Sequence, residues 1–168
     1  MSVSDAVLVA GATRGDRDAL AALYERHASA VYTLALRLLG NPSDAEDVLQ
    51  DVFLGLTHAL DRYSEQGAFA AWLLRITARS ALARARNRRP DESLRADHPQ
   101  RPSDHGTRMD IDAALAVLPN TLRTPFVLRA VEGFSHDEIA ALLDISPANA
   151  MQRYSRACKQ LRSLLDRV

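Results

Sequence analysis

The chain has 168 residues, of which 47% are hydrophobic and 5% aromatic; this composition excludes a wholly disordered protein and leaves room for one or two small domains. The formal net charge is zero, with 21 basic and 21 acidic residues, so any attraction to a charged partner must come from local patches. The single cysteine, Cys158, excludes an internal disulfide and a zinc site made of cysteines.

The composition favours an all-helical protein. Seven glycines, seven prolines and few runs of β-branched residues argue against a sheet. No apolar stretch approaches the ~20 residues that a membrane span needs. The N-terminal stretch MSVSDAVLVAGATRGD has a short apolar run and no basic segment before it, so we expect no signal peptide. We therefore expect a cytoplasmic all-α protein without membrane insertion.

The first long helix is predicted over residues 16–39. Apolar residues between Leu20 and Leu38 recur at steps of three and four, which is the pattern of a helix with one buried stripe. Gly40 and Pro42 are expected to end it. The stripe predicts that this helix forms one side of the core of a first domain.

The next helix is acidic on one side. We expect it to begin at Ser43, because Ser43 and Glu46 have the spacing of a capping box. Its segment DAEDVLQDVFLGL contains four acidic residues and no basic one. Three of the carboxylates recur at steps of three and four and share one face, with a glutamine near its edge. The polar residues of this face are Asp44, Asp47, Gln50 and Asp51.

A polar loop at residues 61–67 separates the acidic helix from an arginine-rich one. This third helix is predicted from Phe69 to about Arg88, and Pro90 closes it. Its segment WLLRITARSALARARNRR contains six arginines and no acid. Together the two helices offer one surface to a basic protein partner and another to a phosphate backbone. Such a pair of surfaces is typical of an adaptor that brings nucleic acid to another protein complex.

A linker is expected after the arginine-rich helix. The stretch PDESLRADHPQRPSDHGTR, which begins at Pro90, contains three prolines and almost no large apolar residue. Such a composition is typical of a flexible connection between domains. We therefore expect a first domain at residues 1–90, a flexible linker at 91–109 and a second domain at 110–168.

The second domain is predicted to open with short helices. Residues 111–118 form a short amphipathic pattern that Pro119 interrupts. Thr124 and Pro125 then have the character of an N-cap and a first helical residue. Gly133 is expected to end that helix.

The end of the chain has the spacing of a helix-turn-helix. Ser135 and Glu138 form a capping box that opens a short helix, and a turn around Asp144 follows. Ser146 then caps a longer helix that runs to the C-terminus. The same spacing also fits an ordinary helical hairpin, so DNA binding is one of two interpretations here. The exposed residues that could reach a major groove are Gln152, Arg153, Ser155 and Arg156.

Taken together, these segments resemble the extracytoplasmic-function (ECF) group of bacterial sigma factors over nearly the whole chain. The resemblance depends on the order and spacing of the segments and on the linker between them, since no single motif is decisive. The matching segments are GDRDALAALYERHASAVYTLALRLLG, DAEDVLQDVFLGL, FAAWLLRITARSALARARNRR, LPNTLRTPFVLRAVEGFSHDEIAALLDIS and RYSRACKQLRSLL.

The resemblance implies two roles for the first domain. It would bind the clamp helices of core RNA polymerase and open the minus-ten element of the promoter. The implied polymerase contacts are Asp47, Gln50 and Asp51, with Asp44 on the same face. The loop between Tyr63 and Ala68 would hold an unstacked base together with Trp72, and arginines would hold phosphates. The implied contacts to minus-ten DNA are Tyr63, Trp72, Arg75, Arg79, Ser80, Arg84 and Arg88.

For the second domain, the resemblance implies recognition of the minus-thirty-five element through the last helix and contact with the polymerase flap. It also implies an anti-sigma factor that clamps both domains. Met151 stands where the family usually has Lys or Arg, Ala150 where Val is usual and Cys158 where Arg is usual. Since methionine has no donor for a base edge, we expect weak or altered recognition there. The implied DNA contacts are Gln152, Arg153, Ser155, Arg156 and Lys159.

Two other interpretations stay open from the sequence. One is a stand-alone helix-turn-helix regulator, although an acidic helix that repels DNA argues against it. The other is a nucleotide hydrolase that holds Mg²⁺ on the acidic helix, through Asp44, Glu46, Asp47 and Asp51. No second carboxylate-bearing helix and no phosphate-binding glycine loop accompany those residues. The five histidines lack ligand spacing, so we expect no metal or other cofactor and no enzymatic activity.

Overall fold

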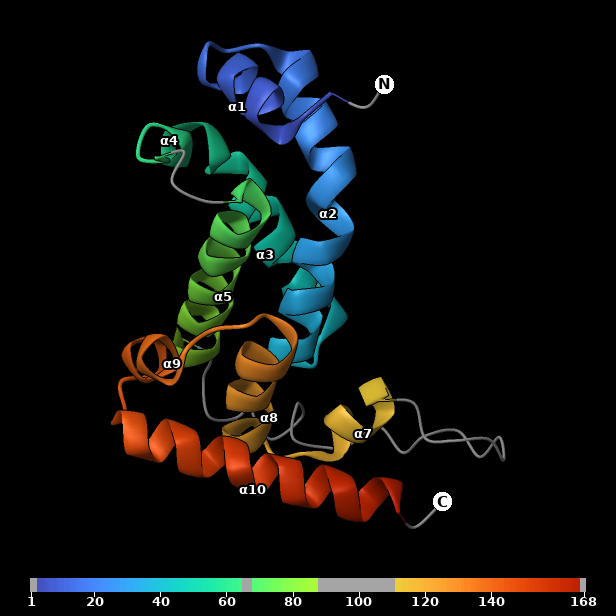
Figure 1. The fold of residues 1–168 in the computed structure, drawn as a ribbon. Coiled ribbons are helices and arrows are strands. Elements are labelled where there is room, and N and C mark those ends of the chain that lie inside the picture. The colour runs from blue at the N-terminus through green and yellow to red at the C-terminus, as the bar shows by residue number, and fades with distance from the viewer. Residues whose placement is uncertain (1–2, 65–67, 88–110, 167–168) are drawn as a thin grey trace. The chain divides into compact units, whose positions relative to one another are not determined.

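The computed structural model describes residues 3–64, 68–87 and 111–166, which form helices joined by turns with no strand among them (Figure 1). They divide into two compact units, the first made mostly of residues up to Arg84 and the second mostly of the residues after it. The predicted all-α class with two helical domains is confirmed. The predicted linker at 91–109 lies outside the described residues, so its flexibility stays a prediction.

Five of the described helices lie mainly in the first unit. They are α1 (Asp5–Thr13), α2 (Arg17–Leu39), α3 (Pro42–Leu54), α4 (Leu56–Leu60) and α5 (Phe69–Asn87). Helix α4 packs against both α1 and α3. The core is aliphatic, as the scarcity of aromatic residues predicts. Its fully buried side chains include Leu23, Leu34, Val48, Leu56 and Leu73.

The two long helices of this unit agree with their predicted ranges. Helix α2 ends where expected, and Gly40 follows it with a φ of 68°, a left-handed conformation that glycine adopts without strain. Helix α5 begins at Phe69 as predicted, and its last described residue is Asn87. The predicted contact residue Arg88 lies outside the described residues.

The predicted N-cap of the acidic helix is wrong by two residues. The N-cap of α3 is Asn41, whose side-chain oxygen accepts hydrogen bonds from the backbone N–H groups of Ser43 (2.9 Å) and Asp44 (3.2 Å). Pro42 is the first helical residue, a position where its missing N–H group costs nothing. Ser43 is therefore already inside the helix, and the expected capping box with Glu46 does not form.

The second unit contains five described helical segments. They are α7 (Ile111–Val117), α8 (Asn120–Phe126), the π-helix η1 (Val127–Val131), α9 (His136–Leu143) and α10 (Pro147–Leu165). Helix α10 packs against α8 and α9. Side chains from α9 and α10 meet in this core, where Ile139, Ala150, Ala157 and Leu161 are buried.

The predicted helix start at Thr124 is also wrong. Helix α8 begins earlier, at Asn120, with Pro119 as its N-cap, so that Thr124 and Pro125 lie inside the helix and are buried. Proline has no N–H group to donate to the preceding turn, and the helix widens into η1 two residues later, at Val127. Of two prolines a few residues apart, the first marks the helix start.

The helix-turn-helix geometry is confirmed. The hydroxyl of Ser135 accepts a hydrogen bond from the backbone N–H of Glu138 (3.1 Å), and the Glu138 carboxylate accepts one from the backbone N–H of Ser135 (2.8 Å). Asp144 ends α9 in the left-handed conformation, with a φ of 54°. Ser146 caps α10 by accepting a hydrogen bond from the backbone N–H of Asn149 (3.2 Å).

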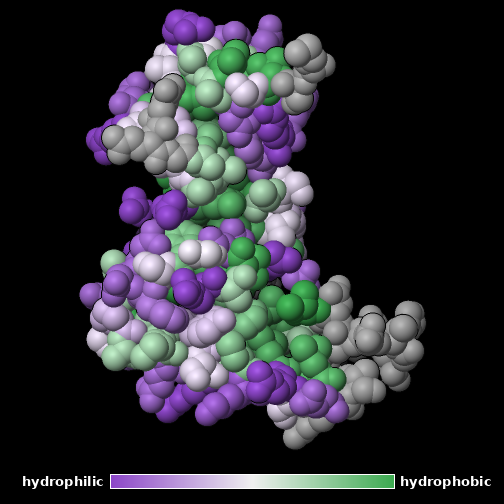
Figure 2. Space-filling model, viewed as in Figure 1, coloured by the Kyte–Doolittle hydropathy of each residue, from purple (hydrophilic) through white to green (hydrophobic). Residues whose placement is uncertain are grey.

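The surface of the second unit is hydrophilic along α10. Figure 2 shows hydrophilic side chains along this helix, which is the long red helix of Figure 1. Among the described residues, no helix combines the length and the apolar character needed to span a bilayer.

Candidate functional site

The acidic face of α3 consists of Asp44, Asp47, Gln50 and Asp51, as the spacing predicts. The four side chains differ in how far they reach solvent. Gln50 and Asp51 are exposed, and 47% of the Asp47 side chain is exposed. Asp44 is nearly buried, with 13% of its side chain exposed. Gln50 and Asp51 therefore face solvent, Asp47 faces it in part, and Asp44 lies at the buried edge.

Arg84 of α5 binds two of these carboxylates. Its Nε lies 2.9 Å from a carboxylate oxygen of Asp44, and a terminal nitrogen of the guanidinium contacts Asp47. The hydrogen bond with Asp44 raises the pKa of Arg84 above its usual value, against the opposing effect of burial. Arg84 thus links the two helices of opposite charge, in addition to the phosphate-binding role that the sequence predicts.

The pairing of Arg84 with the acidic face could not be foreseen from the sequence. The nearer carboxylate is 37 positions away in the chain, and helical periodicity carries no information on which faces of two helices meet. The change of charge sign between α3 and α5 was the available signal. That change of sign predicts two separate surfaces, whereas the structure joins them at Arg84.

The other predicted minus-ten residues of α5 lie along the helix at different depths. Arg75 and Arg79 are exposed and one turn apart, so they share a face from which both can reach a phosphate backbone. Ser80 is half-buried beside them. A pair of exposed arginines on one helix face is suited to adjacent phosphates of a single strand.

An aromatic cluster lies at the start of α5. The ring centroids of Tyr63 and Trp72 are 4.9 Å apart, which brings the two predicted base-binding residues together. Phe69 completes the cluster, 5.7 Å from Trp72 and 5.8 Å from Tyr63, and His27 packs edge-on against Phe69 at 5.3 Å. Spacing in the sequence does not predict that Phe69 and His27 belong to this cluster, because their membership depends on how α2 and α5 pack.

The cluster has a buried base and a partly open top. Phe69 is buried, whereas Tyr63 and Trp72 are half-buried, so each of the latter contributes both to packing and to an accessible ring surface. Rings held in this way can stack on an unpaired base without first losing conformational freedom. Residues 65–67 of the predicted base-binding loop lie outside the described residues.

On α10, the predicted DNA-contacting residues face solvent with one exception. Gln152, Ser155, Arg156 and Lys159 are exposed. Arg153 is half-buried, and its Nε donates a hydrogen bond to the side-chain oxygen of Asn149 (2.8 Å). Met151 is 55% exposed on the same helix.

The opposite side of α10 is structural. Tyr154 stacks on Phe126 with ring centroids 5.9 Å apart, and His136 packs edge-on against it at 5.7 Å. A hydrogen bond with Cys158 and, to a lesser extent, burial raise the pKa of the Tyr154 hydroxyl above its usual value. Cys158 therefore contacts Tyr154 on the packed side of the helix.

The magnesium-site interpretation gains no support from this geometry. In the parts of the chain that the structure describes, no three His, Cys, Asp or Glu side chains converge as metal ligands would. Two of the carboxylates proposed for that site, Asp44 and Asp47, are already paired with Arg84.

Comparison with known proteins decides between the remaining interpretations. Residues 23–90 match the family model of Sigma-70 region 2, and residues 108–161 match that of Sigma-70, region 4. The RNA polymerase sigma factor CarQ of Myxococcus xanthus is 35% identical over 159 residues, covering 90% of this chain and 91% of CarQ. The chain belongs to the ECF sigma factors of bacterial RNA polymerase.

This sigma factor is also similar to two other proteins, SigE and CnrH. The ECF RNA polymerase sigma factor SigE of Mycolicibacterium smegmatis is 37% identical over 155 residues, which is 85% of this chain but only 60% of SigE. The solved structure of CnrH in complex with the cytosolic domain of CnrY is 31% identical, with a TM-score of 0.61, and the likeness covers 96% of this chain and 97% of CnrH.

Membership of this family identifies the two units of the sigma factor as region 2 and region 4. Region 2 takes in most of α2 and the helices α3 to α5, which carry the acidic face and the aromatic cluster. Region 4 takes in α7 to α9 and most of α10. The protein is a transcription initiation factor that binds core RNA polymerase and promoter DNA, and it is not an enzyme. A stand-alone regulator would not carry region 2, so that interpretation is set aside.

Proposed function

We propose that this sigma factor binds core RNA polymerase through the acidic face of α3, opens the minus-ten element with α5 and reads the minus-thirty-five element with α10. The observation that carries the proposal is that Gln50 and Asp51 are exposed on one face of a helix, beside Asp47, whose side chain stays 47% exposed although Arg84 contacts it. Below them the helix packs on the region 2 core through Val48 and Val52. A rigid helix that presents carboxylates in a row suits a partner helix with basic side chains.

For promoter opening, the aromatic cluster supplies ring surfaces on which an unstacked base would stack. Extruding a base costs a few kcal/mol, and stacking on an aromatic ring returns about 1–3 kcal/mol per base. Trp72 and Tyr63 offer such rings at the start of α5, and Arg75 and Arg79 follow on the same helix. The clamp helices of the polymerase and the opened strand would therefore be bound by neighbouring helices of one unit.

For upstream recognition, α10 offers both base-reading and phosphate-binding side chains. Gln152, Ser155 and Arg156 would read base edges in the major groove, with Arg153 and Lys159 on phosphates. Met151 contributes no hydrogen-bond donor beside them. This supports a promoter sequence preference different from that of relatives with Lys or Arg at this position. Contact of region 4 with the polymerase flap belongs to the same proposal.

We also propose that an anti-sigma factor holds the protein inactive by clamping both regions, and that the protein acts in the cytoplasm. The solved structure of the relative CnrH in complex with the cytosolic domain of CnrY supports a protein partner of this kind and a cytoplasmic place of action. An inhibitor of this kind would cover the acidic face and the DNA-binding side chains at once.

A double variant tests the docking face. Replacing Asp47 and Asp51 by alanine should weaken binding to purified core polymerase by at least tenfold, since two charge pairs are lost. Titration of core enzyme into labelled sigma factor measures the affinity, and circular dichroism checks the fold. The variant R75A/R79A is the control, because its charges belong to the DNA surface. Unchanged polymerase affinity of D47A/D51A would refute the docking face.

A further inference from the structure

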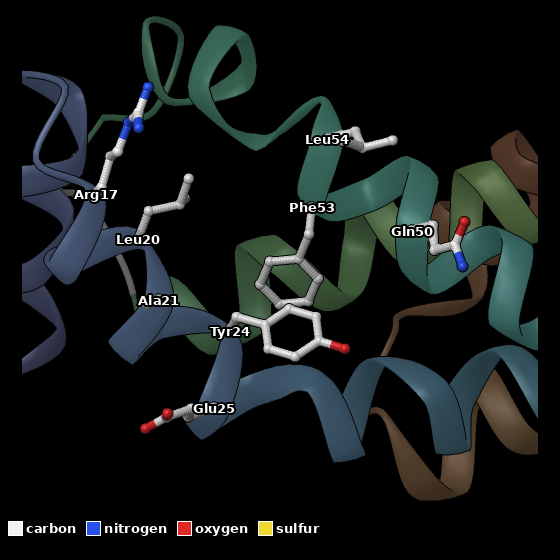
Figure 3. Close-up of a pocket in the computed structure, with 8 residues that line it drawn as sticks. All are labelled: Arg17, Leu20, Ala21, Tyr24, Glu25, Gln50, Phe53 and Leu54. Atoms are coloured by element: carbon white, nitrogen blue, oxygen red, sulfur yellow. The ribbon is translucent and has the colours of Figure 1, made fainter.

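An apolar groove lies between α2 and α3, beside the acidic face (Figure 3). Its volume is about 550 Å³, which is enough for one or two side chains of a partner. Charged residues contribute only Arg17 and Glu25 to its lining. Its other lining residues are Leu20, Ala21, Tyr24, Gln50, Phe53 and Leu54.

The groove has a preformed floor and an exposed apolar rim. The rings of Tyr24 and Phe53 pack edge-on, with centroids 4.8 Å apart, and Figure 3 shows them against each other between the two helices. At the rim Leu54 is 77% exposed, and the floor is open to solvent because Tyr24 is 45% exposed. Single exposed apolar residues are ordinary, but several that gather in one hollow are typical of a binding surface.

The groove is continuous with the acidic face. Leu54 follows Gln50 by four residues and Asp47 by seven, so the three lie on one side of α3. Gln50 belongs to both surfaces. A partner helix lying along α3 would therefore meet carboxylates at one point and the groove about one turn further on.

We propose that this groove receives a large apolar side chain from the same RNA polymerase helix that binds the acidic face. The inference rests on the proposed docking of region 2 and adds a second component to it. The partner helix is amphipathic, with Lys or Arg opposite Asp47 and Asp51 and a Leu, Ile, Met or Phe about one turn away. The carboxylates accelerate association, and the groove slows dissociation.

The charges beside the groove argue against other occupants. A second copy of the chain bound symmetrically through this surface would bring Asp47 and Asp51 close to their own counterparts, and like charges repel. A DNA backbone would be repelled by the same carboxylates. A basic amphipathic helix is the partner that satisfies both the apolar groove and its acidic border.

The test compares Leu54→Gln with Val7→Gln on binding to intact core polymerase. Val7 is 60% exposed on α1 and lies outside the groove, so it controls for the loss of an exposed aliphatic side chain. We expect L54Q to weaken binding about tenfold, mainly through faster dissociation and with its salt dependence retained. V7Q should bind as the unaltered chain does. Because Leu54 is exposed, both variants should keep their circular dichroism and thermal midpoint.

Each alternative outcome contradicts the groove proposal in a recognisable way. If L54Q binds polymerase normally while D47A/D51A does not, the groove is not part of the docking surface although the acidic face is. If both variants bind normally, the docking face itself is wrong. If L54Q instead abolishes self-association in light scattering, or weakens only the binding of an anti-sigma factor, the occupant is a different one and the proposal falls.

Discussion

At the scale of single residues, Arg84 joins the two charged helices of region 2, α3 and α5. Its guanidinium binds Asp44 and Asp47, although its position in an arginine-rich segment suggested a phosphate contact. A nearly buried carboxylate without a counter-charge is costly, so a partner for Asp44 is needed whether or not DNA is bound. The pair therefore stabilises the packing of α5 on α3.

The stability of Arg84→Ala tests this role. Since 35% of the Arg84 side chain is exposed, solvent screens the pairs, and we expect a loss of only about 1 kcal/mol in the free energy of unfolding. Urea denaturation measures it. R79A is the matched control, because Arg79 is exposed on the same helix and should change stability by less than about 0.5 kcal/mol. Equal stability of the two variants, with weaker promoter binding by R84A, would show that Arg84 serves DNA alone.

At the scale of helices, sequence patterns correctly predict features that depend on residues close together in the chain. The ranges of α2 and α5 follow from apolar residues at steps of three and four, and the capping box of α9 follows from two residues three positions apart. Predictions were wrong where two capping signals compete. Asn41 caps α3 in place of Ser43, and Pro119 opens α8 in place of Pro125. Each pair lies within one or two turns, and apolar periodicity does not distinguish positions that lie so close together.

Contacts between elements could not be predicted from the sequence. The residues of the acidic face and the pair Tyr63 and Trp72 were named from spacing and family resemblance, and the structure brings each set together. Phe69 in the aromatic cluster and the groove beside Tyr24 depend on how helices pack against one another. Periodicity assigns a residue to a face, but it does not say which faces meet.

The start of α5 carries a prediction about promoter opening. Trp72→Ala should leave assembly with core polymerase unchanged and reduce open-complex formation about tenfold or more, because a stacked base loses its ring. Fluorescence of 2-aminopurine in the minus-ten element reports the opening. W72F keeps a ring and should recover most of it. If W72A opens promoters normally, the cluster is only part of the core.

At the scale of the whole molecule, one neutral chain combines surfaces of opposite charge. The acidic face and the exposed arginines of α5 belong to region 2, while α10 supplies a basic surface in region 4. Local charge, and not the net charge of zero, decides which partner each surface attracts. With the roles proposed for these surfaces, a small protein without catalytic chemistry would direct an enzyme to chosen sites on DNA.

Transcription from purified components tests this account most directly. Core RNA polymerase would be mixed with the sigma factor and with genomic DNA of its host, and the 5′ ends of the RNA would be sequenced. We predict new start sites that share one pair of upstream elements, present with the unaltered protein and lost with D47A/D51A. Start sites identical to those of core polymerase alone would contradict the account.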